Sequence, residues 1–361
     1  MSSVEISPGK LWGLRRLADD KGLYKMLAVD QRPPIKNLVK ERRAVEEAPY
    51  EDVAAVKRAL VQYLAPSASA LLLDPHVAYP QSIDLVSPKQ GVILTLEDSI
   101  FEQTPGGRKS AEIENWSVQK IKTIGGDAVK VLAWYRPDAD PNVCAFQQEY
   151  VRKIGKACQE FDLPFVFEML VYPLPTDSAD AQTQDYVEHP EKRPDLVLDS
   201  VSEFAKPEYG VDLFKLESPV LAKGIADPDT GDKEEVAKTQ ALFDDLGKRA
   251  GRPWVMLSAG AGRDDFKNVL KYAFKAGASG FLAGRAIWWD AFQNFPDMDK
   301  MGKDLKEKAV PYFGELNKLT DAKATPWEKH EMFGGEGPKL AGKGQTFRES
   351  VPAAGGGCVI A

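Results

Sequence analysis

The sequence predicts an α/β protein in which short parallel strands alternate with helices. Three observations carry this prediction: short continuous apolar runs, amphipathic segments between them, and glycines where several of those segments end. Continuous apolar runs are typical of parallel strands that are covered on both faces. Glycine is common just after the last turn of a helix, as at Gly125-Gly126, Gly251 and Gly277. Because eight runs alternate with helices, we expect a single-domain (β/α)8 TIM barrel.

The predicted strands share their length and apolar character, and they lie at Tyr24–Asp30, Ala70–Asp74, Gly91–Leu96, Ala128–Ala133, Pro164–Leu170, Val211–Glu217, Pro253–Ser258 and Ser279–Ala283. Apolar residues at helical spacing predict helices between several of them, at Tyr50–Leu64, Glu112–Ile124, Pro141–Phe161, Asp232–Ala250 and Arg263–Ala276. A doubly wound sheet is the main alternative. The barrel is favoured over it because no dinucleotide-binding glycine pattern opens the first helix.

Three further segments complete the predicted organisation. A helix over Pro8–Asp19 is expected to close the bottom of the barrel. The stretch Tyr172–Pro194 is rich in Pro and Asp and predicts a long loop over the active face. Gly, Pro and Lys become frequent from about Ala322. We therefore expect a barrel domain over residues 1–321 and a Gly-rich tail over 322–361, poorly ordered or draped on the barrel.

Composition bounds the class of protein. Hydrophobic residues make up 43% of the chain and charged residues 28%, which is typical of a soluble globular protein with a substantial core. The formal net charge of -7 argues against nucleic acid as the main partner, although a cationic pocket for an anionic substrate remains compatible with it. The N-terminus lacks an apolar signal core and no apolar run approaches membrane-spanning length, so no membrane association is expected.

The three cysteines indicate a reduced, cytoplasmic chain. Cys144 and Cys158 fall in one predicted helix and are therefore about 21 Å apart along its axis, too far for a disulfide. The last four residues, Cys358-Val359-Ile360-Ala361, match a prenylation pattern in form. No polybasic stretch stands beside them, so a chance ending of the Gly-rich tail is the better interpretation.

The most informative residue is Lys215, which stands alone in the apolar run Val211–Pro219. An ammonium group is costly to remove from water, so a strand that carries one inward usually does so for chemistry. Burial disfavours the charged form and leaves a free amine that can attack a carbonyl. Lys215 is therefore a candidate nucleophile.

Strand alternation places further ionisable side chains on inward faces near the carboxyl ends of the strands, where barrel enzymes carry their catalytic groups. These residues are Asp30, Lys130, Glu168, and Glu217 together with Lys215. Agreement among four strands favours a common site. The alternative is a buried ion-pair network that fixes the barrel without catalysing anything.

Two glycine-containing turns follow the seventh and eighth predicted strands and indicate anion binding. Ser258 and Gly260 lie in the first turn, and Gly284 and Arg285 lie in the second. Backbone amides and helix N-termini after these two strands favour a phosphate dianion. The alternative is two ordinary turns with Arg285 on the surface.

Taken together, these residues resemble the class I tagatose-1,6-bisphosphate aldolase family, which includes the bacterial sulfofructose-phosphate aldolases. The resemblance spans roughly residues 20 to 320 in order. The motifs that carry it are Ala28-Val29-Asp30-Gln31-Arg32, Val129-Lys130-Val131, Phe167-Glu168, Phe214-Lys215-Leu216-Glu217-Ser218-Pro219, Leu257-Ser258-Ala259-Gly260 and Ala283-Gly284-Arg285.

The resemblance implies a metal-independent aldolase, a carbon–carbon lyase without cofactor. It would cleave a ketose phosphate to dihydroxyacetone phosphate and an aldehyde. Lys215 would form the Schiff base and Glu168 would be the acid/base. The resemblance also implies two groups of neighbouring residues: Lys130 and Asp30 beside the lysine, and Gln31, Arg32, Ser258, Gly260, Gly284 and Arg285 as substrate- and phosphate-binding residues.

Other readings of the same residues remain open. A metal-dependent enzyme would need clustered imidazoles, but the only histidines are His76, His189 and His330, and none stands in a predicted strand. A barrel with the same phosphate site could perform isomerisation or decarboxylation, with Lys215 acting only through its charge. A non-catalytic sugar-phosphate sensor is a third reading. The group at the far end of the substrate, the C4 stereochemistry and the order of a homo-oligomer are not fixed by the sequence.

Overall fold

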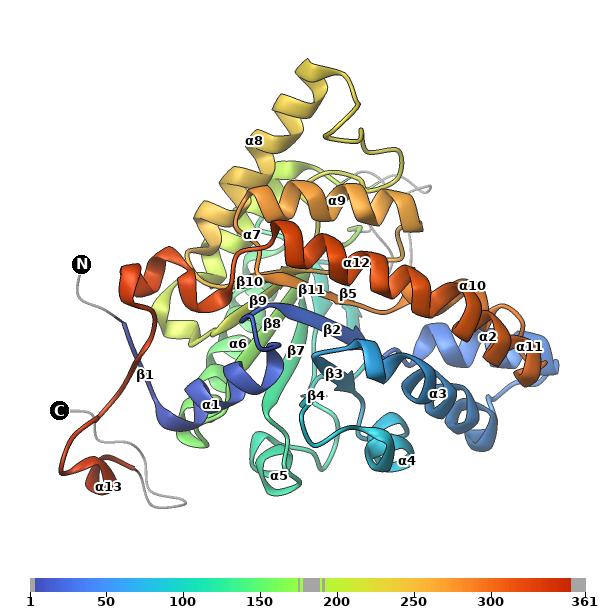
Figure 1. Cartoon of the computed structure of the whole chain (residues 1–361), viewed down its shortest axis with the longest axis horizontal. Coiled ribbons are helices and arrows are strands. Elements are labelled where there is room, and N and C mark those ends of the chain that lie inside the picture. Colours follow the sequence, from blue (N-terminus) through green and yellow to red (C-terminus); the bar gives the residue numbers. More distant parts are fainter. Residues whose placement is uncertain (1–3, 175, 178–188, 190–191, 352–361) are drawn as a thin grey trace.

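A computed structural model of the chain describes residues 4–174, 176–177, 189 and 192–351. Eight parallel strands form a closed barrel at its centre and helices surround them (Figure 1). The strands follow one another around the barrel in chain order: β2 (Tyr24–Ala28), β3 (Ala70–Leu73), β4 (Gly91–Thr95), β7 (Ala128–Trp134), β8 (Phe165–Leu170), β9 (Leu213–Leu216), β10 (Trp254–Met256) and β11 (Gly280–Ala283). The barrel closes where β11 pairs with β2. The predicted TIM-barrel fold is therefore confirmed.

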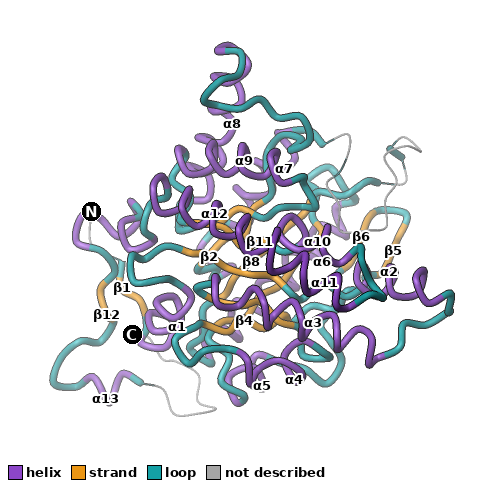
Figure 2. Tube along the Cα trace, turned by 45° about the vertical axis from the view of Figure 1, so that its right-hand side comes forward, coloured by secondary structure: helices purple, strands orange, loops and turns teal. Residues whose placement is uncertain are grey.

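Helices enclose the strands on the outside (Figure 2). The described helices are α1 (Pro8–Leu17), α2 (Pro33–Arg43), α3 (Tyr50–Leu64), α4 (Ala78–Ser82), α5 (Val118–Thr123), α6 (Pro141–Glu160), α7 (Pro194–Phe204), α8 (Lys233–Ala250), α9 (Arg263–Lys275), α10 (Arg285–Phe292), α11 (Met298–Asp304), α12 (Val310–Lys323) and α13 (Phe347–Ser350), the last of which lies apart from the barrel (Figure 1). Two short strand pairs lie outside the barrel: β1 (Glu5–Ile6) with β12 (Lys339–Leu340), and β5 (Glu102–Thr104) with β6 (Gly107–Lys109). Short 3-10 turns lie at Ala65–Ser67, Ile83–Leu85, Pro207–Tyr209, Trp327–Lys329 and Glu331–Glu336, and a π-helical turn at Leu305–Ala309 joins α11 to α12.

The helix predicted over Glu112–Ile124 was wrong in its first half. Glu112 forms an isolated antiparallel bridge with Glu97, so the chain there is extended. The helix begins only after Ser117, whose side chain accepts a hydrogen bond from the backbone N–H of Lys120 and caps the first turn. Apolar spacing alone did not reveal the extended stretch before Ser117, because the bridge depends on a partner distant in sequence.

The barrel interior is apolar at the bottom and charged at the top. In β2 and the residue that follows it, Met26 and Ala28 belong to the interior cluster, whereas Leu27 and Val29 pack in the layer between strands and helices. Leu14 and Leu17 of α1 join the interior cluster at the amino-terminal ends of the strands, so α1 closes the bottom as expected. The ionisable side chains lie at the other end of the barrel, where the carboxyl-terminal ends of the strands lead into loops.

Part of the predicted C-terminal tail packs against this bottom layer. Trp327 and Phe333 are buried in the interior cluster, with their rings edge to face at a centroid distance of 5.7 Å. Further along, β12 pairs with β1 beside α1 (Figure 2). The segment from Trp327 to Leu340 therefore packs at the bottom of the barrel, through two buried aromatic residues and a strand pair, while the domain boundary at residue 321 stays a prediction.

Some expectations fall on residues that are not described. Much of the loop expected over 172–194 lies outside the described residues, as does the terminal Cys358. Cys144 and Cys158 both lie in α6 as buried free thiols, which agrees with the prediction that they form no disulfide. In the described part of the chain, every helix is too short or too polar to cross a membrane.

Candidate active site

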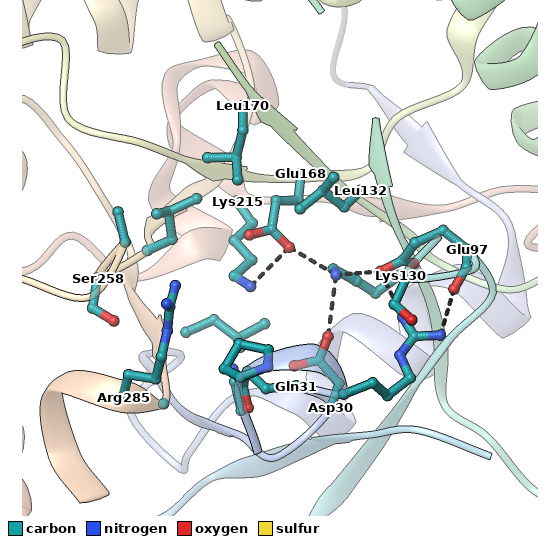
Figure 3. A pocket seen from close by; sticks show the side chains of 18 of the residues that line it. Asp30, Gln31, Glu97, Lys130, Leu132, Glu168, Leu170, Lys215, Ser258 and Arg285 are labelled. Atoms are coloured by element: carbon teal, nitrogen blue, oxygen red, sulfur yellow. Dashed lines mark hydrogen bonds and ion pairs between the residues drawn. The ribbon is translucent and has the colours of Figure 1, made fainter. Parts of the chain in front are cut away.

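A pocket opens at the carboxyl-terminal end of the barrel (Figure 3). Of the ten residues predicted to form the site, nine line it: Asp30, Gln31, Arg32, Lys130, Glu168, Lys215, Ser258, Gly284 and Arg285. The tenth, Gly260, lines a neighbouring pocket that shares Arg285 with the first. The structure thus gathers residues from six strand ends into one cavity.

Lys215 lies at the centre of this cavity because of its place in β9. Leu213 belongs to the interior cluster, while Phe214 and Leu216 pack outward, so alternation turns Lys215 inward. Its side chain is 6% exposed. The ladder between β8 and β9 sets Lys215 directly beside Glu168, and the Nζ atom lies 2.9 Å from Oε2 of that carboxylate.

Glu168 is shared between two lysines. The Oε2 atom that contacts Lys215 also lies 2.8 Å from Nζ of Lys130 (Figure 3). Burial by itself would raise the pKa of Glu168, but Lys130 and Lys215 outweigh it and hold the pKa below its ordinary value. Glu168 is therefore an ionised carboxylate in the resting site.

Lys130 is surrounded by carboxylates. Besides Glu168, its Nζ atom lies 3.2 Å from Asp30 Oδ2 and 2.6 Å from Glu97 Oε1. Burial would lower the pKa of Lys130, but the three carboxylates raise it well above its ordinary value. Lys130 is thus a fixed cation and is poorly suited to give up its proton.

Asp30 follows β2, just beyond the last residue of the ladder. Burial would raise its pKa, yet Lys130, Lys215 and Arg32 together lower the pKa to about 2. Asp30 therefore stays ionised throughout the neutral range. Its bond to Lys130 holds that ammonium on the side of the pocket away from Ser258 (Figure 3).

Glu97 is a site residue that the sequence reading missed. It follows β4, is buried, and joins the network through Lys130 and through Arg32, whose Nη1 donates to the Glu97 carbonyl at 2.9 Å. The same alternation that identified Asp30 places Ile93, Thr95 and Glu97 on one face. The predicted strand ended at Leu96, one residue too early to include it.

Arg32 and Glu217 have other partners than the sequence suggested. Arg32 braces Glu97 at the carboxylate-rich end of the pocket, with Nη2 3.7 Å from Glu97 Oε1. Glu217 was expected on the face of Lys215, but it lies past the end of β9 and accepts the backbone N–H of Val171 at 2.7 Å. It also pairs with Lys192, so it ties the loop after β8 to β9.

The opposite end of the pocket is suited to an anion. Ser258 and Arg285 lie together across the cavity from Lys130 (Figure 3). Arg285 is the first residue of α10, so a helix N-terminus faces the same region. Gly260 has φ +80°, a backbone conformation that glycine adopts without strain, and it lies next to the Arg285 guanidinium.

The histidines give no metal cluster in the part of the chain that is described. There, no group of three or more His, Cys, Asp and Glu side chains is arranged to hold a metal ion. Asp74, which the sequence placed near His76, accepts the backbone N–H groups of His76 and Val77 instead.

The fold and the site define a (β/α)8-barrel enzyme whose pocket centres on a lysine, with carboxylates on one side and a cationic helix start on the other. Residues 24–290 match the model of the DeoC/LacD family aldolases. The chain belongs to this family, which makes it a carbon–carbon lyase and sets aside the isomerase, decarboxylase and sensor readings. The predicted family resemblance is confirmed.

Curated relatives of this chain are similar over nearly their whole length. The tagatose 1,6-diphosphate aldolase of Listeria innocua is 33% identical over 334 residues, covering 90% of this chain and 95% of the relative. The tagatose 1,6-diphosphate aldolase 2 of Enterococcus faecalis is 31% identical, covering 90% of this chain and 97% of the relative. These matches cover a larger share of the chain than the family model, which matches residues 24–290.

Solved structures share the fold at low identity. An archaeal fructose 1,6-bisphosphate aldolase superposes with a TM-score of 0.56 at 18% identity, covering 86% of this chain and 98% of that one. The fructose-bisphosphate aldolase of Plasmodium falciparum superposes with a TM-score of 0.62 at 14% identity, covering 90% and 99%. These likenesses support the barrel architecture.

Proposed function

We propose that the protein is a class I aldolase that reversibly cleaves a ketose phosphate through a Schiff base on Lys215. The products would be dihydroxyacetone phosphate and an aldehyde. The observation that carries the proposal is the buried Lys215 amine, 2.9 Å from a carboxylate that is itself bridged to a fixed cation. Because relatives over nearly the whole chain are named tagatose 1,6-diphosphate aldolases, tagatose 1,6-bisphosphate is the first substrate to test.

Substrate orientation follows from the two ends of the pocket. The phosphate would bind at Ser258, Gly284 and Arg285, where a cation and a helix N-terminus favour an anion. This sets the ketone carbon beside Lys215. The carbon chain beyond it then runs toward Lys130 and the carboxylates, which suit its hydroxyl groups.

Schiff-base formation requires a neutral amine on Lys215. Glu168 is the acceptor in contact with Lys215 and can take its proton, while Lys130, whose pKa is raised by its carboxylate neighbours, keeps its own proton. The free amine adds to the C2 carbonyl of the ketose and forms a carbinolamine. The carbinolamine hydroxyl, protonated by Glu168, leaves as water and gives an iminium.

Carbon–carbon cleavage uses the iminium as an electron sink. Glu168 accepts the proton of the C4 hydroxyl while the electrons of the C3–C4 bond move toward the iminium nitrogen. The aldehyde leaves and an enamine remains on Lys215. Protonation of C3 and addition of water then release dihydroxyacetone phosphate and restore the lysine.

The test is a product analysis with a matched lysine pair of variants. Wild-type protein should convert tagatose 1,6-bisphosphate to dihydroxyacetone phosphate and an aldehyde, identified by mass spectrometry, and EDTA should leave the rate unchanged. Lys215→Met should abolish turnover, whereas Lys153→Met, on the exposed face of α6, should retain it. Full activity in Lys215→Met, or activity lost to EDTA and restored by a divalent metal, contradicts the proposal.

Two expectations belong to the same proposal. We expect a cytoplasmic location, which suits the two free thiols of α6. We also expect a sugar phosphate as the small-molecule partner, no cofactor, and a homo-oligomer as the candidate assembly. Ketoses carrying phosphate or sulfonate at the far end belong in the same substrate panel.

A further inference from the structure

The end of β2 is held by side chains from outside the barrel. The carbonyl of Ala28 accepts a hydrogen bond from Nε1 of Trp288 in α10 at 3.1 Å. The next carbonyl, that of Val29, accepts one from Nζ of Lys57 in α3 at 3.0 Å. Both donors are fully buried. These two carbonyls directly precede Asp30, where the chain turns from the strand into the pocket.

Lys57 is an unusual residue for its surroundings. It lies in α3 with Val53, Val56 and Leu60, which are core residues of the apolar layer between helices and strands. Its ammonium also contacts the carboxylate of Asp74, which has no exposure either. An ion pair in such a place adds little or nothing to stability relative to apolar side chains of similar volume. Stability therefore gives a poor account of why a charge stands here.

The contacts of this pair give a better account. Asp74 follows β3 and accepts the backbone N–H groups of His76 and Val77. Lys57 therefore joins the carboxyl ends of two neighbouring strands, with the Val29 carbonyl on one side and the Asp74 turn on the other. A charge-assisted hydrogen bond fixes the Val29 peptide more firmly than a neutral contact does.

We propose that Lys57 is a positioning residue, which holds the Val29 peptide so that Asp30 points at Lys130. Asp30 Oδ2 lies 3.2 Å from Lys130 Nζ, and that ammonium in turn contacts the acid/base candidate Glu168. A shift of the Val29 peptide would reach the reacting centre through Asp30 and Lys130. The inference deepens the proposed aldol cleavage and rests on it.

The experiment separates positioning from charge balance. Lys57→Met keeps the length of the side chain, loses the hydrogen bond to Val29 and leaves Asp74 unpaired. The double variant Lys57→Met/Asp74→Asn also removes the unpaired charge, while the Asn side-chain oxygen still accepts the turn N–H groups. We expect the double variant to regain most of the melting temperature that the single variant loses, but not its kcat.

A comparable pair at the other end of the barrel is the control. Lys10 of α1 pairs with Asp212 at 2.8 Å, just before β9, and Lys10 is also buried. Lys10→Met should lower the melting temperature and leave kcat within about twofold of the wild-type value. It therefore shows what the loss of a buried Lys–Asp pair does when the pair is remote from the pocket.

The expected kinetic result is a fall in kcat of about 10- to 100-fold for both variants at position 57, which is the scale of small misplacements of catalytic groups. KM for tagatose 1,6-bisphosphate should change by less than about threefold, because the Ser258 and Arg285 end is untouched. A double variant that regains kcat together with melting temperature overturns the inference, as does a kcat within about twofold of wild type. If Lys57→Met does not fold, kcat and melting temperature are compared between wild type, the double variant and Trp288→Phe. Trp288→Phe removes the side-chain hydrogen bond to the Ala28 carbonyl.

Failure of the proposed function gives a different pattern. In that case wild-type protein forms no borohydride-stable adduct on Lys215 with the ketose, whatever residue stands at position 57. An adduct in the wild-type protein with unchanged kcat at position 57 contradicts the positioning role alone.

Discussion

Lys215 and Lys130 contact the same oxygen atom of Glu168, Oε2, at 2.9 Å and 2.8 Å respectively. One of these lysines has three carboxylate neighbours and a strongly raised pKa. The other has Glu168 as its contact on the side of the open pocket (Figure 3). In the proposed mechanism this asymmetry gives different roles to two lysines that the sequence presents alike: Lys130 is the fixed charge and Lys215 is the nucleophile.

Replacing Glu168 tests its role as acid/base. Glu168→Gln keeps the shape of the side chain but cannot take the proton of the C4 hydroxyl. We expect kcat to fall by about 10²–10⁴-fold, the usual contribution of a positioned acid/base, in a coupled assay for dihydroxyacetone phosphate. Glu114→Gln, an exposed change, should leave kcat unaltered. A Glu168→Gln enzyme within about threefold of wild type would exclude Glu168 from proton transfer.

Acid stability should report the buried carboxylate of Asp30. Its folded-state pKa of about 2 lies below the ordinary 3.8, so between these values the unfolded chain binds more protons than the folded one. Asp30 therefore contributes about 2 kcal/mol of stability, present in full above about pH 5 and lost as the pH falls toward 2.

The measurement for this prediction is the free energy of unfolding by urea at pH values between 6 and 2.5. Asp30→Asn should make the decline below pH 4 shallower than in wild type. Equal slopes for the two proteins would show that Asp30 is not the group whose protonation is linked to unfolding.

Arg285 should act on substrate affinity more than on the chemical step. Arg285→Met removes a cation from the anion end of the pocket and leaves the network around Lys215 in place. Loss of a hydrogen bond to a charged group is worth about 1.5–3 kcal/mol, so KM should rise about 10- to 150-fold with a much smaller change in kcat.

The control for the Arg285 prediction is Arg263→Met. Arg263 lines the neighbouring pocket and contacts Asp290, so its loss should leave KM nearly unchanged. Equal effects of the two variants would indicate a general loss of positive charge instead of a phosphate contact.

Gly284 should tolerate no side chain. A Cβ there would lie 2.6 Å from the carbonyl oxygen of Ala28 and 2.8 Å from Nε2 of Gln31. Gly284→Ala must therefore displace the end of β2 or the start of α10, at a cost of about 1–3 kcal/mol, with a fall in kcat/KM. Gly314→Ala, in an open place within α12, should instead stabilise the protein by about 0.5–1 kcal/mol. Urea denaturation compares the two.

The sequence was sufficient for the barrel because its strands are short continuous apolar runs that alternate with helical segments. It was also sufficient for the inward direction of Asp30, Lys130, Glu168 and Lys215, since alternation within a strand is a local property. The direction of those four side chains could be predicted without knowing which residues lie across the barrel.

Contacts between distant segments were beyond the reach of the sequence. Glu97 was missed because it lies one residue past the end of the apolar run, beyond the last residue of β4. The start of α5 was predicted too early because the bridge between Glu97 and Glu112 keeps the chain extended there. Packing of Trp327 under the barrel was likewise invisible, because a composition rich in Gly and Pro says nothing about one buried aromatic residue.

The central claim is that the Lys215 amine bonds covalently to the substrate, and borohydride trapping with peptide mass spectrometry tests it most directly. Incubation with tagatose 1,6-bisphosphate and borohydride should inactivate the enzyme and add the mass of reduced dihydroxyacetone phosphate to the peptide that contains Lys215. The Lys130 peptide should stay unmodified. An active enzyme with an unmodified Lys215 peptide after the same treatment would contradict the account.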